Sequence, residues 1–135
     1  MSCNNGKHPG REILEDLAKR ILDAVYGKHL YLNPEMKLTD LVNEVGSNRT
    51  YVSSVFPRIF GTNFREFINS VRLEYAESFI KGLNERKSDD KCLNMEDIAI
   101  ISGFGDKRTL YNAMKRNKVD ISSLLKEEKN RGKVK

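Results

Sequence analysis

The sequence predicts an all-α protein with two helix-turn-helix subdomains joined by a long connecting helix. Its apolar residues recur at helical spacing, and the alternating pattern of strands is almost absent. One apolar pattern also occurs twice: the segment that begins at Leu38 and turns at Gly46 reappears as the segment that begins at Met95 and turns at Gly103. Each copy reads as a short helix, a glycine turn and a second helix, which is the pattern of a helix-turn-helix.

The first predicted helix runs from about residue 10 to residue 26, and Gly27 is expected to end it. Residues 28–37 break the periodicity and are predicted to form a loop, with Tyr31 and Leu32 packed beneath the domain. The expected core-facing stripe of this helix consists of Ile13, Leu14, Leu17, Ala18, Ile21, Leu22 and Val25.

The first repeated unit follows, with helices predicted over residues 38–45 and from Arg49 onward. Gly46 suits the left-handed backbone of the turn, and Asn48 is a good N-cap for the second helix. Pro57 lacks the N–H that would bond the carbonyl of Ser53, and its ring crowds that carbonyl. We therefore expect the second helix to kink or stop near Phe56.

A long helix is predicted over residues 63–81, ended by Gly82. It would span about 28 Å. A helix-turn-helix carries its second helix, the reading helix, into the DNA major groove. Neighbouring major-groove segments on one face of B-DNA lie about 34 Å apart, so the long helix suits a spacer between two reading helices. A core helix without a metric role fits the periodicity equally well. Within it, Arg72 is expected to form a buried or bridging salt link to a carboxylate, with a phosphate contact as the alternative.

The second repeated unit begins after a charged segment, residues 83–94, that is predicted to be a solvated loop. Asn94 and Asp97 have the spacing of a capping box, and Asp106 is placed to cap a second helix. We assign residues 10–82 to the first subdomain with its connecting helix and residues 95–126 to the second. The inward residues of the second unit are expected to be Ile98, Ala99, Ile101, Leu110, Ala113 and Met114.

Composition narrows the function classes without selecting one. The 135 residues hold 24 Lys and Arg against 19 Asp and Glu, which gives a net charge of +5 and weakly favours an anionic partner. Cys3 and Cys92 are too few for a disulfide framework and lack metal-ligand spacing. Residues 1–9 resemble a linker and residues 127–135 form a basic tail. The sequence has no long apolar run and no signal peptide, so we expect a soluble protein in the cytoplasm, associated with the nucleoid when it is bound to DNA.

Catalysis is disfavoured by the residues present. The two histidines, His8 and His29, both lie near the N-terminus, and no motif places a nucleophile beside a base. There is no glycine-rich phosphate cradle, so neither a cofactor nor a catalytic residue is predicted, and no metal site is assigned. Asp89 and Asp90 fall in the charged loop, where a solvated carboxylate pair is expected.

Three runs of residues resemble the DNA-binding domain of the arabinose-operon regulator (AraC/XylS) family. They are GSNRTYVSSVF from Gly46, FINSVRLEYA from Phe67 and DIAIISGFGDKRTL from Asp97. The resemblance covers roughly residues 13–125. It includes the one residue that the second copy adds after its glycine turn, where Gly103 to Leu110 matches Gly46 to Val52. It implies two helix-turn-helix units on one long helix, double-stranded DNA as the partner, and RNA polymerase or a fused sensor or dimerisation domain as further partners.

The resemblance also implies which residues face DNA. In the first unit these are Arg49, Thr50, Tyr51, Ser53 and Ser54; in the second they are Lys107, Arg108, Thr109, Tyr111 and Asn112. Arg and Lys can donate to guanine, and Asn can pair with adenine, so the residue types suit base readout.

Two departures from the family pattern keep a second hypothesis open. The position of Pro57 is commonly basic in the family, and the residues after Arg116 lack the usual aromatic, glycine and proline. The alternative function is therefore a helical protein-interaction module with degenerate helix-turn-helix units.

Overall fold

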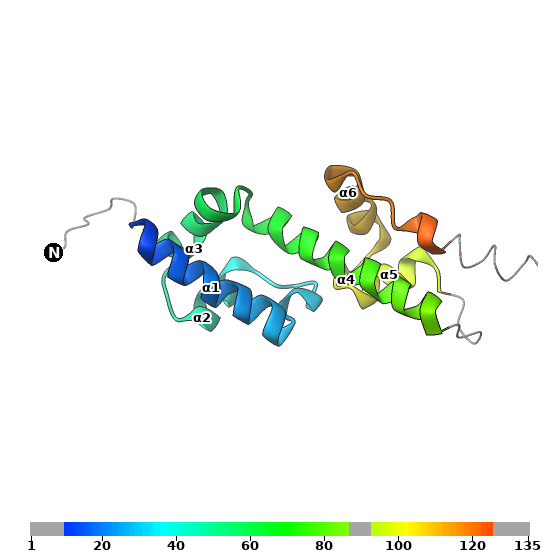
Figure 1. The fold of residues 1–135 in the computed structure, drawn as a ribbon, viewed down its shortest axis with the longest axis horizontal. Coiled ribbons are helices and arrows are strands. Elements are labelled where there is room, and N and C mark those ends of the chain that lie inside the picture. The colour runs from blue at the N-terminus through cyan, green and yellow to red at the C-terminus, as the bar shows by residue number, and fades with distance from the viewer. Residues whose placement is uncertain (1–9, 87–92, 126–135) are drawn as a thin grey trace, which may run out of the picture. The chain divides into compact units, whose positions relative to one another are not determined.

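The computed structural model describes residues 10–86 and 93–125, and within these ranges it contains helices and turns but no strand (Figure 1). The predicted all-α class is confirmed. A short 3₁₀ turn, Leu30–Leu32, follows the first helix, and residues 122–125 form a last helical turn. The helices in chain order are α1 (Arg11–Lys28), α2 (Leu38–Val45), α3 (Arg49–Val55), α4 (Phe64–Arg86), α5 (Met95–Ile101) and α6 (Lys107–Asn117).

The chain divides into two compact units. The first contains the residues up to Tyr31 together with Glu35–Ile68, and the second contains Leu32–Pro34 together with the residues from Asn69 onward. The short Leu32–Pro34 segment therefore belongs to the second unit, although its neighbours in sequence belong to the first. The predicted tails, residues 1–9 and 127–135, lie outside the described residues.

In the first unit α1 packs against α2 and α3 through one side only. Two members of the predicted stripe are wrong, because Ile13 is 47% exposed and Leu22 is 36% exposed. At about 100° per residue these two positions lie at opposite margins of the buried arc. Ala24, which the prediction omitted, is buried at one margin. The buried residues of α1 are Leu14, Leu17, Ala18, Ile21, Ala24 and Val25.

The end of α1 was predicted wrongly. Gly27 lies inside the helix, and the left-handed residue that ends it is His29, with φ of 54°. A glycine in a helix costs only about 1 kcal/mol relative to alanine. Contacts with the rest of the unit support this end of the helix, since Lys28 pairs with Glu44 of α2 and Val25, two residues before Gly27, is fully buried.

The connecting helix is also longer than predicted. Asn63 caps it by accepting a hydrogen bond from the Glu66 N–H at 2.8 Å, as its predicted start requires. Gly82 does not end it, because α4 continues to Arg86 and so takes in residues 83–86 of the predicted loop. Residues 87–92 of that loop lie outside the described residues. Ile80, fully buried two residues before Gly82, shows that packing supports this part of the helix.

The second unit has its own apolar core, in which α4, α5, α6 and the segment after α6 meet. The predicted inner residues of α5 and α6 are confirmed at Ile98, Ala99, Leu110, Ala113 and Met114, whereas Ile101 is only half-buried. No helix in the described ranges is long and apolar enough to cross a membrane. The remaining core residues are Leu73, Ala76, Ile80, Phe104, Ile121 and Leu125.

Candidate nucleic-acid interface

The turn between α2 and α3 has the predicted geometry. Gly46 adopts a left-handed backbone with φ of 70°, and its N–H bonds the carbonyl of Val42 at 3.1 Å. The side-chain oxygen of Asn48 then accepts a hydrogen bond from the Tyr51 N–H at 2.8 Å, which caps α3. Both features are local consequences of residue type, because glycine tolerates positive φ and asparagine satisfies an unpaired helix donor.

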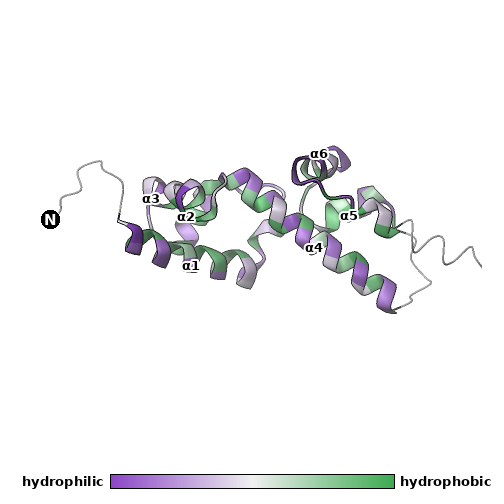
Figure 2. Cartoon of the chain, turned by 45° about the horizontal axis from the view of Figure 1, so that its top comes forward, coloured by the Kyte–Doolittle hydropathy of each residue, from purple (hydrophilic) through white to green (hydrophobic). Residues whose placement is uncertain are grey.

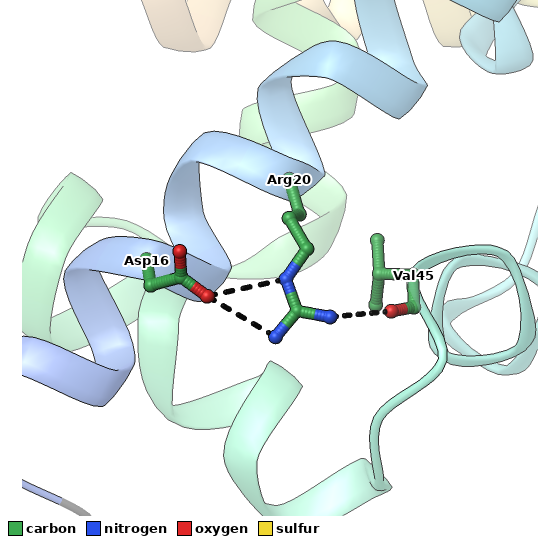
Figure 3. A network of polar contacts seen from close by, with 3 residues as sticks. All are labelled: Asp16, Arg20 and Val45. Atoms are coloured by element: carbon green, nitrogen blue, oxygen red, sulfur yellow. Dashed lines mark hydrogen bonds and ion pairs between the residues drawn. The ribbon is translucent and has the colours of Figure 1, made fainter.

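An arginine on α1 holds the end of α2 in the first unit. Arg20 donates from Nη1 to the carbonyl oxygen of Val45 at 3.0 Å, and its other nitrogens reach the Asp16 carboxylate at 3.2 and 3.3 Å (Figure 3). Val45 is the last residue of α2 and precedes the turn glycine. Arg20 therefore satisfies a carbonyl that the helix itself leaves without an internal donor.

The predicted DNA-facing residues of α3 lie on its surface. Arg49, Thr50 and Ser53 are exposed, and Tyr51 and Ser54 are half-buried. The two serine hydroxyls donate to the Thr50 carbonyl, at 3.2 Å from Ser53 and 2.9 Å from Ser54. Each hydroxyl thus uses its single proton within the helix and presents acceptor lone pairs to a ligand. The sequence could not predict that these hydroxyls act as acceptors, because the direction of their hydrogen bonds depends on the side-chain rotamer.

The α-helical geometry of α3 ends just before Pro57, but the backbone stays helical beyond it. The helix stops at Val55, as predicted, and Phe56–Phe60 continue as one turn of π-helix. Gly61 closes that turn with φ of 73° and donates its N–H to the Phe56 carbonyl. Pro57 has no N–H for the i→i−4 hydrogen bond of an α-helix, and the chain continues past it in the wider π-helical turn. It also packs Phe56 against three further rings, at centroid distances of 5.7 Å to Phe60, 5.6 Å to Phe64 and 5.5 Å to Phe67.

The second unit repeats the arrangement, with two capped helices joined by a glycine turn. Asn94 and Asp97 form the predicted capping box, with hydrogen bonds of 2.9 and 3.1 Å. After α5, Gly103 and Gly105 have φ of 93° and 90°, on either side of the buried Phe104. These two left-handed residues turn the chain into α6.

Asp106 caps α6 by accepting the Thr109 N–H at 2.8 Å, as predicted. Hydrogen bonds from the backbone and side chain of Thr109, and the nearby charge of Arg108, hold the pKa of Asp106 below its ordinary value of 3.8. The carboxylate therefore stays ionised beside the first turn of α6.

The outer face of α6 carries the remaining predicted residues. Lys107, Arg108 and Asn112 are exposed, Tyr111 is 42% exposed, and Thr109 is half-buried. Figure 2 draws α6 mostly in purple, in agreement with this polar surface. Two more exposed cations, Lys115 and Arg116, lie in its last turn. All of these side chains come from one helix, whose apolar residues face the core.

Arg72 is buried, in agreement with the expectation that favoured a buried contact over a phosphate contact. It is only 7% exposed, so a phosphate contact is excluded. Its guanidinium donates to the Asn69 side chain and to the Asn33 carbonyl, each at 3.0 Å, and lies 5.7 Å from the centre of the Phe104 ring. Both of these acceptors are neutral oxygen atoms. The only sequence signal was an arginine among the apolar residues of a helix.

The chain is similar to uncharacterized HTH-type transcriptional regulators of Staphylococcus aureus. Those of strains MSSA476 and MRSA252 are each 24% identical to it over 109 residues, which is 80% of this chain and 13% of each relative. The chain thus spans a small part of the length of the curated relatives it matches. No family model and no solved structure matches it. The likeness and the two capped turns together support a helix-turn-helix domain.

Proposed function

We propose that the protein binds double-stranded DNA in a sequence-specific manner to regulate transcription, with α3 and α6 as the reading helices. The observation that carries the proposal is that both helices follow a capped turn and present polar N-terminal turns to solvent while their apolar residues are buried. This is the form in which a helix-turn-helix offers side chains to base edges. The names of the relatives, HTH-type transcriptional regulators, point the same way.

The two reading helices would make different contributions. On α6, Lys107 and Arg108 offer donors for guanine or phosphate, and Asn112 offers a donor and acceptor pair for adenine. On α3 only Arg49 is cationic, and the serine hydroxyls present acceptors because their protons are bonded within the helix. Acceptors suit the amino groups of adenine and cytosine and repel phosphate. We therefore expect the second unit to supply more of the affinity and the first unit to refine the sequence preference.

The resemblance to the AraC/XylS family extends the proposal to two adjacent major-groove segments of one duplex, one for each reading helix. It also suggests that control comes from a fused sensor or dimerisation domain and that RNA polymerase is the downstream partner. The relatives support the idea of a longer regulator, because the matched region makes up 13% of each. In this setting the protein would act in the cytoplasm without catalysis.

The second candidate is a protein-interaction module that has kept the fold and lost DNA binding. The observation that favours it is the first unit, where Pro57 stands at a position that is commonly basic in the family and α3 carries a single cation. Such a surface would bring few phosphate contacts to a duplex.

Salt-dependent binding to duplex DNA separates the two candidates. Each phosphate contact releases condensed counterions, so the affinity of a DNA-binding protein should fall steeply and linearly on a logarithmic salt scale. Selection of bound sites from a random duplex pool would then show a preferred sequence. Failure to retain any duplex at about 50 mM salt, where such binding is strong, would favour the interaction module.

Replacement of one reading residue tests the assignment more closely. Loss of a good bidentate contact to a base costs about 1–3 kcal/mol of discrimination, so Arg108→Ala should weaken binding and broaden the selected sequence. The matched control is Arg11→Ala, which removes another exposed arginine, one that pairs with Glu15 on α1. If Arg108→Ala and the unchanged protein select the same sequence, Arg108 takes no part in base readout.

A further inference from the structure

We propose that Arg72 is a positioning residue for α6: from α4 it clamps the Leu32–Pro34 segment and the α5–α6 turn together, and so sets the orientation in which α6 is presented. The proposal rests on the proposed function for its biological meaning, and on contacts within the second unit for its physical content. Three contacts link Arg72, the Leu32–Pro34 segment and the turn: one joins Arg72 to the segment, one joins Arg72 to the turn, and one joins the segment to the turn.

The first contact is the guanidinium itself. Arg72 is the buried cation of the described core, and its two Nη groups donate to different acceptors, the Asn69 side chain on its own helix and the backbone carbonyl of Asn33. The planar fork of arginine can hold two acceptors at fixed angles, whereas the ammonium of lysine is a single point of charge. The side chain is therefore set in one direction and fixes a loop carbonyl.

The second contact is with the ring of Phe104. The guanidinium carbon lies 5.7 Å from the ring centre, within the range of a cation–π interaction. Phe104 is buried, and its N–H bonds the Ala99 carbonyl at 2.9 Å. Phe104 precedes Lys107, the first residue of α6, by only three positions. A shift of this ring would therefore be passed directly to the start of α6.

The third contact closes the clamp from the other side. A Cβ added to Gly105 would lie 3.2 Å from the Cβ of Pro34, so the turn backbone passes tightly against the same segment that Arg72 holds. Gly105 also has φ of 90°, which other residues rarely adopt. The residue after it is Asp106, the cap of α6. Arg72, Pro34 and Gly105 thus enclose the turn that aims the helix.

The experiment compares amide hydrogen exchange in the unchanged protein, Arg72→Lys and Gly105→Ala. Lysine keeps the charge and loses the fork, and alanine strains the turn without touching Arg72. In both variants, exchange in the first turns of α6 should accelerate at least about tenfold more than exchange at Ala76 and Ile80, which lie in the same core on α4. Equal acceleration at both places would mean a general loss of stability in the second unit and would overturn the proposal.

Arg20→Lys is the matched control, because Arg20 holds the end of α2 in the first unit by a similar contact. It should leave exchange in α6 unchanged. Unaltered exchange of α6 in both test variants would also refute the clamp. If Arg72→Lys does not fold, Phe104→Leu decides the result, because it keeps an apolar side chain and removes the ring that Arg72 contacts.

Binding-site selection then connects the clamp to DNA. In Arg72→Lys, the half of the preferred sequence that Arg108→Ala broadens should lose definition, while the other half is kept. If the unchanged protein binds no duplex, the proposed function fails, yet the exchange result still decides whether Arg72 positions α6. An Arg72→Lys protein with loosened α6 and unchanged sequence preference would contradict the role in recognition.

Discussion

Residues two positions apart on α6 face opposite surroundings, so the contribution of the helix to stability can be tested separately from its proposed contact with DNA. Leu110 is 0% exposed and belongs to the apolar core of the second unit, whereas Asn112 two positions later is exposed. Removal of a buried leucine side chain costs about 2–5 kcal/mol, through lost transfer energy and the cavity that remains. Because Leu110 is wholly enclosed, we expect Leu110→Ala to fall within that range.

That cost is a large part of the total free energy of unfolding. A domain of this kind unfolds with a free energy of about 5–15 kcal/mol, so Leu110→Ala should shift the urea midpoint strongly. Far-ultraviolet circular dichroism during urea titration measures the change. Asn112→Ala should alter stability by no more than about 0.5 kcal/mol, and should change the selected DNA sequence instead.

The matched control is the same substitution at an exposed site. Leu22 on α1 is 36% exposed, so Leu22→Ala should cost clearly less than Leu110→Ala. The reasoning would be refuted if the two substitutions cost the same, or if Leu110→Ala cost less than about 1 kcal/mol, because burial would then not explain the stability of the helix.

Two glycines should respond to alanine with opposite signs. Gly27→Ala, in open space within α1, should stabilise the fold by about 0.5–1 kcal/mol, and Gly46→Ala, at φ of 70°, should destabilise it, as thermal unfolding of both variants would show. Asn48→Ala removes the cap of α3 and should cost about 1 kcal/mol in urea unfolding; no loss would mean that the cap is not used. The lowered pKa of Asp106 means that its contribution is complete above its ordinary value of 3.8 and disappears as pH falls through its folded-state value. Titration of Asp106 followed by NMR should therefore give a pKa below 3.8, and an ordinary value would contradict the cap.

The sequence alone determined the parts of this protein that depend on near neighbours. The caps at Asn48, Asn94 and Asp106 and the left-handed turn at Gly46 appear where residue type predicted them. Each is decided within about four residues, because one side chain or one φ angle satisfies a local requirement of the helix end. The apolar stripes that bury α3 and α6 follow from the same short period.

Only the tertiary structure decided the features that depend on residues far apart. α1 and α4 run through Gly27 and Gly82 because packing offsets a small local cost, which no local rule contains. Arg72 donates to the carbonyl of Asn33, which lies 39 positions away in the sequence, so this partner could not be inferred from the residues near Arg72. The exposed faces of α3 and α6 were predictable from the sequence, whereas the contacts that aim them required the fold.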